Sequence, residues 1–203
     1  MSESSSQLVP GSVLPLARTD KKQWKLGQER LIASGILTDQ GTLAASPAKD
    51  AQWRLSIRSV LGAGEYDTQG WREVLTLISG EFLQLTVGDA AQGLEPLRPF
   101  PFTAAAPVGL SQPNEEVLLI HVAHRPDAAR ATVRIVELSK KYDQHLFDGQ
   151  LGILVQGKAH ALAAQGFEAD LQLRDTVIGG DSSGVRISGR GILAVVSFDP
   201  SNS

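Results

Sequence analysis

A regular alternation of apolar and polar residues is the feature that most limits how this chain can fold. Residues 53–60 read as one strand, and over residues 53–58 every second side chain is apolar and those between are arginine or serine. A period of two puts successive side chains on opposite faces of a β-strand. We therefore expect one face of this strand, with Trp53, Leu55 and Ile57, to lie in the core. The other face carries the polar side chains of Arg54, Ser56 and Arg58.

Short apolar or alternating segments continue along the chain, separated by turns rich in glycine, aspartate and proline. Helical periodicity is weak, and residues 128–130 form at most a short helix or a turn. Many short strands spaced by roughly 8–12 residues are typical of a β-sandwich or barrel. The sequence therefore predicts an all-β fold with further strands within residues 74–87, 118–124, 132–138, 152–164, 169–178, 185–188 and 192–198.

Two segments, residues 75–85 and 151–161, repeat one pattern: an apolar strand, a polar residue, a glycine and a second strand. Because glycine readily adopts the positive φ of a tight turn, we predict hairpins with Gly80 and Gly157 at their tips. One such hairpin per half is typical of a double jelly roll, the double-stranded β-helix of cupins. We therefore divide the chain into a disordered tail, two cupin-like halves and a polar tail: residues 1–12, 13–140, 141–198 and 199–203.

Composition narrows the function classes. The 203 residues include no cysteine, which excludes disulfides and thiolate metal sites. Nineteen basic and twenty-two acidic residues are interspersed, so no basic stripe indicates nucleic-acid binding. No segment approaches the ~20 apolar residues of a membrane span, and the start of the chain does not resemble a secretory signal. We expect a cytoplasmic protein that binds neither nucleic acid nor membranes, and a homodimer stays open as its oligomeric state.

The histidines do not form the metal-binding motif of cupins. That motif has a His-x-His pair, then a glutamate, then a glycine seven residues later, and imidazole and carboxylate share the metal. Glu73 and Gly80 match its end, but Asp67-Thr68-Gln69 replaces the histidine pair. His121, His124, His145 and His160 are never two residues apart. We therefore expect no metal and no cofactor, and we find no nucleophile elbow or phosphate-binding loop either.

Four segments resemble the HutD/Ves family, and the likeness extends weakly over residues 24–198. The family's Trp-Arg-x-Ser-x strand is similar to residues 53–57, and its Gly-(Pro/Glu)-Phe turn to residues 64–66. Its Leu-Thr-Leu-Leu-Glu-Gly strand is similar to residues 75–80, and its Leu-x-Pro-Leu-x-Pro-Phe-x-Phe segment to residues 94–102. This resemblance implies a bicupin with a small-ligand pocket in a β-barrel and a supporting role in histidine utilisation.

The chain also departs from the family's pattern. Trp24 and Arg30 match an N-terminal signature whose asparagine is replaced by Leu26 and whose middle is two residues shorter. Glu73 stands where the family has arginine, and His121 where it has an asparagine. The pocket that the resemblance implies would contain Trp24, Arg30, Arg54, Ser56, Glu73 and His121.

Two main functions follow. In the first, the chain binds a small carboxylate metabolite in a non-catalytic or regulatory role, with Arg54 as the main anchor beside Ser56. His121 and Glu73 would complete the pocket, and urocanate and formylglutamate are the first candidate ligands by resemblance alone. In the second, a metal-free isomerase or hydrolase uses Glu73 and His121 as acid and base. Binding is favoured over catalysis, and a scaffold without a ligand is a third alternative.

Overall fold

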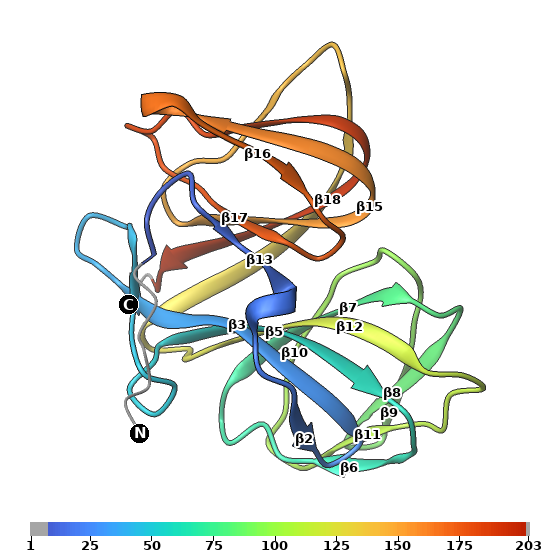
Figure 1. Ribbon diagram of the computed structural model, residues 1–203. Coiled ribbons are helices and arrows are strands. Elements are labelled where there is room, and N and C mark those ends of the chain that lie inside the picture. Colours follow the sequence, from blue (N-terminus) through green and yellow to red (C-terminus); the bar gives the residue numbers. More distant parts are fainter. Residues whose placement is uncertain (1–7, 202–203) are drawn as a thin grey trace.

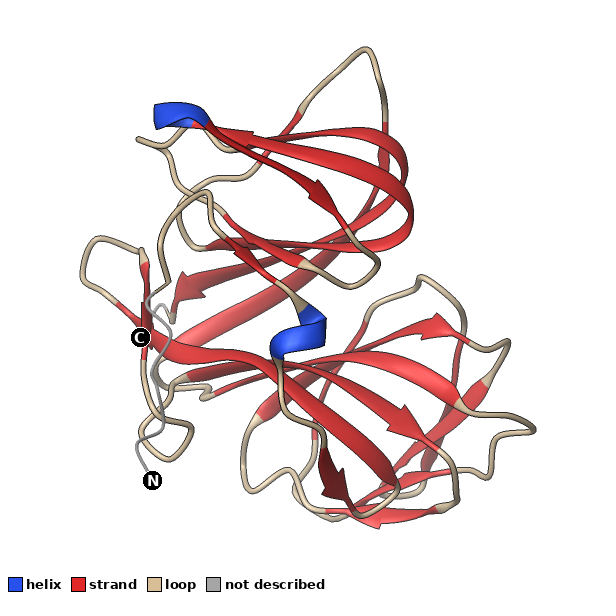
Figure 2. Ribbon diagram, in the orientation of Figure 1, coloured by secondary structure: helices blue, strands red, loops and turns tan. Residues whose placement is uncertain are grey.

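The computed structural model describes residues 8–201 and is built almost entirely of β-strands (Figures 1 and 2). Two short 3-10 helices interrupt the strands, η1 (Leu16–Arg18) and η2 (Ala164–Gly166). The expectation of an all-β fold is therefore confirmed. The strands are β1 (Val13–Leu14), β2 (Lys22–Trp24), β3 (Gly27–Leu37), β4 (Leu43–Ala45), β5 (Trp53–Val60), β6 (Gly64–Tyr66), β7 (Arg72–Ser79), β8 (Leu83–Val87), β9 (Ala90–Leu94), β10 (Phe100–Thr103), β11 (Val108–Leu110), β12 (Val117–His124), β13 (Ala129–Leu138), β14 (Gln144–His145), β15 (Gln150–Ala163), β16 (Phe167–Leu171), β17 (Thr176–Ile178) and β18 (Arg186–Pro200).

The strands form two bodies that pack against each other (Figure 1). The first body contains a seven-stranded sheet in the order β10-β7-β12-β5-β3-β2, with β4 beside β3, and a four-stranded sheet in the order β6-β11-β8-β9. The second body is a seven-stranded sheet in the order β1-β17-β15-β18-β13, with β14 beside β18 and β16 beside β15. Neighbouring strands in all three sheets are antiparallel.

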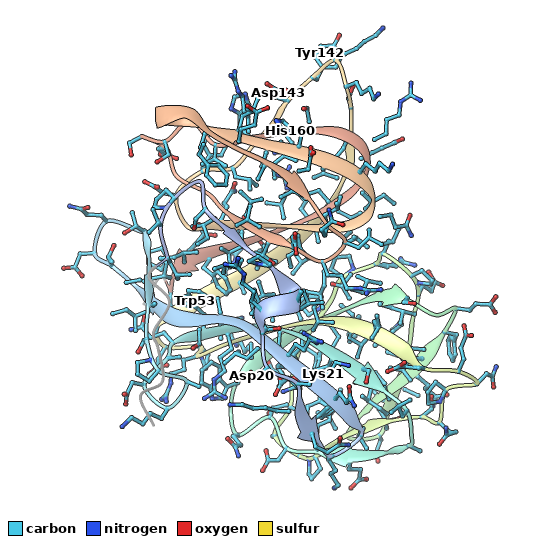
Figure 3. The ribbon with its side chains drawn as sticks, in the orientation of Figure 1. Asp20, Lys21, Trp53, Tyr142, Asp143 and His160 are labelled. Carbon is cyan, nitrogen blue, oxygen red and sulfur yellow. The ribbon has the colours of Figure 1, made fainter. Side chains whose placement is uncertain are left out.

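Strand β5 lies inside the first body's large sheet, between β3 and β12, and buries both of its faces. Its apolar face packs against the second body, where the Trp53 ring lies 4.6 Å from that of Phe198 between ring centroids. Trp53 and Leu55 are fully buried, so the expected core role of this face is confirmed. Figure 3 labels Trp53 at this junction of the two bodies.

The other face of β5 looks into the first body, toward the four-stranded sheet. Most side chains in that interior are apolar, and many of them are fully buried leucines such as Leu77, Leu83, Leu85 and Leu119. The polar side chains of β5 therefore lie in a mostly apolar interior, and this arrangement positions the candidate site described below.

The two predicted hairpins are wrong. Gly80 does adopt a positive φ of 96°, but β7 and β8 on either side of it belong to different sheets. Gly157, at φ 87°, lies within the continuous strand β15, where the pairing with β18 shifts register between Leu154 and Gln156. Both positions therefore have the positive φ that favours glycine. At Gly80 the chain passes from one sheet to another, whereas at Gly157 a long strand bends.

The sheets do not follow the expected division at residue 140. Strand β13, placed by that division in the first half, pairs with β18 along its whole length, from Ala129 to Leu138. Strand β1 likewise pairs with β17 of the second body. Residues 1–7 of the expected disordered tail lie outside the described residues, whereas Gly11 donates its backbone N–H to the Ile178 carbonyl at 2.8 Å. Strand β18 also extends two residues into the expected C-terminal tail.

No helix within residues 8–201 is long and apolar enough to cross a membrane.

Candidate functional site

A group of polar side chains lies within the apolar interior of the first body. They come from five strands, because antiparallel pairing brings β3, β5, β7 and β12 side by side and β6 covers their inner face. Ser56, Glu73 and His121 are each more than nine-tenths buried. We call this group the interior polar cluster: Glu29, Ser56, Arg58, Tyr66, Glu73 and His121.

His121 is at the centre of the interior polar cluster. It lies directly opposite Ser56 across the β12–β5 pair, and Ser56 Oγ is 3.2 Å from His121 Nδ1. On the other side, His121 Nε2 is 3.2 Å from Glu73 Oε1. Those two atoms are close but not aligned for a hydrogen bond, so the buried Nε2 has no hydrogen-bond partner among the described residues.

The two carboxylates are held by different donors. Ser56 Oγ donates to Glu29 Oε1 at 2.8 Å, and Arg58 Nε donates to the same oxygen at 2.8 Å. The hydroxyl of Tyr66 donates to Glu73 Oε2 at 2.8 Å. One connected set of contacts therefore joins Arg58 at one end to Tyr66 at the other.

Arg58 connects the buried part of the cluster to solvent. Its side chain is 16% exposed and that of Glu29 is 26% exposed, against 4% for His121 and 5% for Glu73. The guanidinium carbon lies 4.8 Å from the centroid of the Trp24 ring and 5.9 Å from that of Tyr66, within the range of cation–π attraction. Within residues 8–201, neither terminal nitrogen of Arg58 has a hydrogen-bond acceptor, since only Nε is engaged.

The environment shifts the ionisation of all four titratable neighbours of Arg58. Burial lowers the pKa of His121, and Arg58 lowers it further against the opposing effect of Glu73, so the imidazole is neutral at pH 7. Burial would raise the pKa of Glu73, but the charge of His121 when it is protonated, the charge of Arg58 and the hydrogen bond from the Tyr66 hydroxyl bring it below its ordinary value. The pKa of Glu29 is also lowered, because Arg58 and Ser56 outweigh burial, and burial together with Glu73 raises the pKa of Tyr66.

Of the six predicted site residues, the structure brings four together. Ser56, Glu73 and His121 belong to the interior polar cluster, and Trp24 lies beside it, edge-on to Tyr66 at 5.7 Å between ring centroids. The indole Nε1 of Trp24 donates to the Ser59 carbonyl at 2.9 Å, which fixes the ring next to Arg58.

The other two predicted residues lie apart from the cluster. Arg54 shares the inner face of β5, but its Nη2 donates to the Ala48 carbonyl and its guanidinium stacks on Trp71 at 4.4 Å from the ring centroid. Arg30 points to the opposite face of the sheet, where its Nη1 donates to the carbonyls of Leu16 and Thr19 at 2.8 and 3.0 Å.

Sequence reasoning missed three members of the cluster as site residues: Glu29, Arg58 and Tyr66. Arg58 had a signal, because it continues the alternation of Arg54 and Ser56 on one strand. Glu29 and Tyr66 had none, because their places depend on how β3 and β6 align with the other strands.

The donors present do not fit the metal site of a cupin. The described residues contain no group of three or more histidine, cysteine, aspartate and glutamate side chains close enough to hold a metal ion. His121 is the only imidazole in the cluster, and Glu29 is already paired with Arg58. Imidazole and carboxylate ligands must converge on one point to bind a transition metal, and here they do not.

Comparison with known proteins gives the family and the fold. The HutD family model matches residues 19–195. HutD from Pseudomonas fluorescens SBW25 has a similar structure, with 21% identity, a TM-score of 0.70, and coverage of 93% of this chain and 98% of that one. A conserved protein of unknown function from Pseudomonas aeruginosa PAO1 has 18% identity, a TM-score of 0.76 and the same coverage.

More distant matches have the same kind of fold. A cupin 2 conserved barrel domain protein from Leptotrichia buccalis shares 7% identity at a TM-score of 0.59, with coverage of 96% of this chain and 99% of that one. A search of curated proteins finds no match. At these identities the structures establish a cupin-like fold, whereas the family model matches most of the sequence directly. The chain therefore belongs to the HutD family.

Proposed function

We propose that this chain is a HutD-like bicupin, with a double-stranded β-helix in each body, that binds a small carboxylate metabolite inside the first body. Its role in this proposal is non-catalytic and regulatory, linked to histidine utilisation and exerted in the cytoplasm. The link to that pathway rests on membership of the HutD family. The fold-level part rests on the cupin-like neighbours and on the arrangement of the strands.

The observation that best supports the proposal is that the guanidinium group of Arg58 is held in place but has unused hydrogen-bond donors. Its Nε is bound to Glu29, its flat faces lie near two aromatic rings, and its terminal nitrogens have no acceptor in the part of the chain that the structure describes. A guanidinium fixed in this way is preorganised to donate two parallel hydrogen bonds to a carboxylate. Arg58 therefore replaces Arg54 as the proposed main anchor, because Arg54 is already held by Ala48 and Trp71.

The charges of the interior polar cluster restrict which carboxylates it can bind. Glu29 compensates Arg58, and the ionised Glu73 leaves the buried end of the cluster negative. A ligand with only a carboxylate would be repelled by Glu73, so the ligand should also carry an N–H donor for it. Urocanate has an imidazole N–H and formylglutamate a formamide N–H, and these two remain the first candidates.

The second candidate function is metal-free acid–base catalysis by Glu73 and His121. The contact of 3.2 Å between Nε2 and Oε1, with Ser56 on the other side of the ring, favours it. An efficient acid or base has a pKa close to the working pH. The pKa values of Glu73 and His121 are both lowered, which moves them away from neutrality and makes binding the better-supported function.

Calorimetric titration of the wild type with urocanate, formylglutamate and propionate tests the proposal. A compound with both groups should bind, propionate should bind more weakly, and Arg58→Gln should weaken binding at least about tenfold, the worth of one charge-assisted hydrogen bond. Arg54→Gln is the matched control on the same strand face and should change binding little. The proposal is wrong if the wild type binds none of these acids, or if only Arg54→Gln weakens binding.

The same samples separate binding from catalysis. Each acid that binds is incubated with the protein and excess chelator, and its concentration is followed by chromatography. An unchanged ligand supports the binding role. Conversion that disappears in Glu73→Gln supports the acid–base alternative instead.

A further inference from the structure

A second site is suggested by a cleft on the opposite face of β5, where the two bodies meet. It has a volume of about 420 Å³, within the usual range for small-molecule sites. Its walls come from η1, from β3, β5 and the start of β12 in the first body, and from the turn 172–175 in the second body. The interior polar cluster does not border this cleft, because alternation sends Ser56 and Arg58 to the other side of the sheet.

The cleft combines apolar walls with cations. Leu16, Ile57, Leu118 and Leu173 line it, and Leu173 is 48% exposed there. Lys21, Arg30 and Arg174 also face it, and none of them forms an ion pair with a carboxylate in residues 8–201. Figure 3 labels Lys21 below η1, over the large sheet of the first body.

The acidic groups of the cleft do not cancel this positive charge. Asp175 is buried, and its two oxygens accept the backbone N–H groups of Leu16 at 3.1 Å and Gln172 at 3.0 Å. Glu116 is an exposed residue, so its charge is well solvated. Three cations therefore face two carboxylates, so the cleft keeps a net positive charge, which favours an anionic ligand.

Two of the basic residues are held in place by the backbone. Arg30 is fixed through Nη1 by the carbonyls of Leu16 and Thr19, which leaves the rest of its guanidinium unengaged. Arg174 has a positive φ of 71°, and its backbone N–H donates to the Leu154 carbonyl at 2.7 Å. A strained backbone of this kind in a residue other than glycine persists only where its surroundings hold it, and such residues are frequent at ligand sites.

We propose that this cleft binds a small monocarboxylate with an apolar body, its carboxylate on Arg30, Lys21 and Arg174 and its body against the leucine side chains. The site is distinct from the one proposed inside the first body, and the two do not depend on each other. Because its walls come from both bodies, a bound ligand would also hold the bodies together.

Phenylacetate is the probe, and its neutral counterpart phenylacetamide is the control for charge. Calorimetric titration should show binding of phenylacetate and at least about tenfold weaker binding of the amide. Arg30→Gln would remove the hydrogen bonds that hold η1 and could unfold that segment. The double variant Lys21→Gln/Arg174→Asn avoids this, because asparagine tolerates the left-handed backbone at position 174.

The double variant should lose at least about tenfold in affinity for phenylacetate. The exposed Arg98→Gln should bind phenylacetate as the wild type does. The proposal is overturned if the wild type does not bind phenylacetate, if the amide binds equally well, or if the folded double variant keeps full affinity. Weakening by Arg58→Gln alone would place the probe inside the first body and also overturn it.

Discussion

His121 is a histidine that burial keeps neutral inside an apolar body. In the unfolded chain it titrates near its ordinary pKa of 6.5, whereas burial and Arg58 lower that pKa in the folded chain. The unfolded state therefore binds a proton more readily at mildly acidic pH. The stability that His121 contributes is present above pH 6.5 and is lost as pH falls through the folded pKa.

We therefore expect the free energy of unfolding to fall between pH 7.5 and pH 5.5, as measured by urea denaturation. His121→Gln should reduce this pH dependence without removing it, because burial also lowers the pKa of His124. The exposed His160 should have the opposite effect and serves as a control. Asp170 and Glu168 raise its pKa, so its small contribution to the free energy of unfolding is lost as pH rises. A pH dependence that is unchanged in His121→Gln would contradict the environment described for this ring.

The alternation in residues 53–58 was enough to predict which of these side chains of β5 lie on which face. Period two is a property of a single strand and needs no knowledge of its neighbours. The role of Arg58 beside Glu29 could not be predicted in the same way, because the two are 29 positions apart and meet only through the β3–β5 register. The placement of Arg30 on the opposite face follows from the same register, with Arg30 beside Ile57.

The long strands β15 and β18 bend together, and glycines make the bend sterically feasible. A Cβ at Gly157 would lie 2.1 Å from the Arg190 carbonyl oxygen, a distance at which the backbone must move. The sequence identified Gly157 as a position of positive φ but assigned it to a hairpin. A hairpin turn and a bend within a strand both favour glycine at this position. The pairing of Lys158 with Arg190, just after Gly157, shows that the strand continues.

Gly157→Ala should therefore destabilise the fold by more than backbone strain alone. Gly41→Ala is the matched control, because Gly41 also has a positive φ of 77° but no atom within 4 Å of an added Cβ. Thermal or urea denaturation should give a loss of about 1–2 kcal/mol for Gly41→Ala and a larger one for Gly157→Ala. Equal losses for the two variants would mean that the close approach of β15 and β18 at this bend does not exist.

The two bodies are joined by one shared apolar core, and Trp53 lies at its centre. Its ring is fully buried against Phe198, and the same cluster includes Leu55, Leu151 and Ile153. Because this core contains side chains from both bodies, we expect them to unfold in a single transition. The second body also has an apolar core of its own, with side chains such as Leu146, Leu154 and Ile187.

Trp53→Ala should lower the free energy of unfolding by about 3–5 kcal/mol, the usual effect of removing a large buried aromatic side chain. Urea denaturation followed by circular dichroism measures this loss. A loss below about 1 kcal/mol would show that the ring is not packed between the bodies. Two separate transitions in the wild type would show that the bodies do not share one core.

The central claim is that the interior polar cluster of the first body binds a small carboxylate through Arg58. The most direct test is a crystal structure grown with the acid that binds most tightly in the titrations, at a saturating concentration. The account predicts ligand density inside the first body, with the carboxylate on the Arg58 guanidinium and an N–H group near Glu73. Density for that acid on Arg54 and Trp71 or in the cleft between the bodies, with the cluster unchanged, would contradict it.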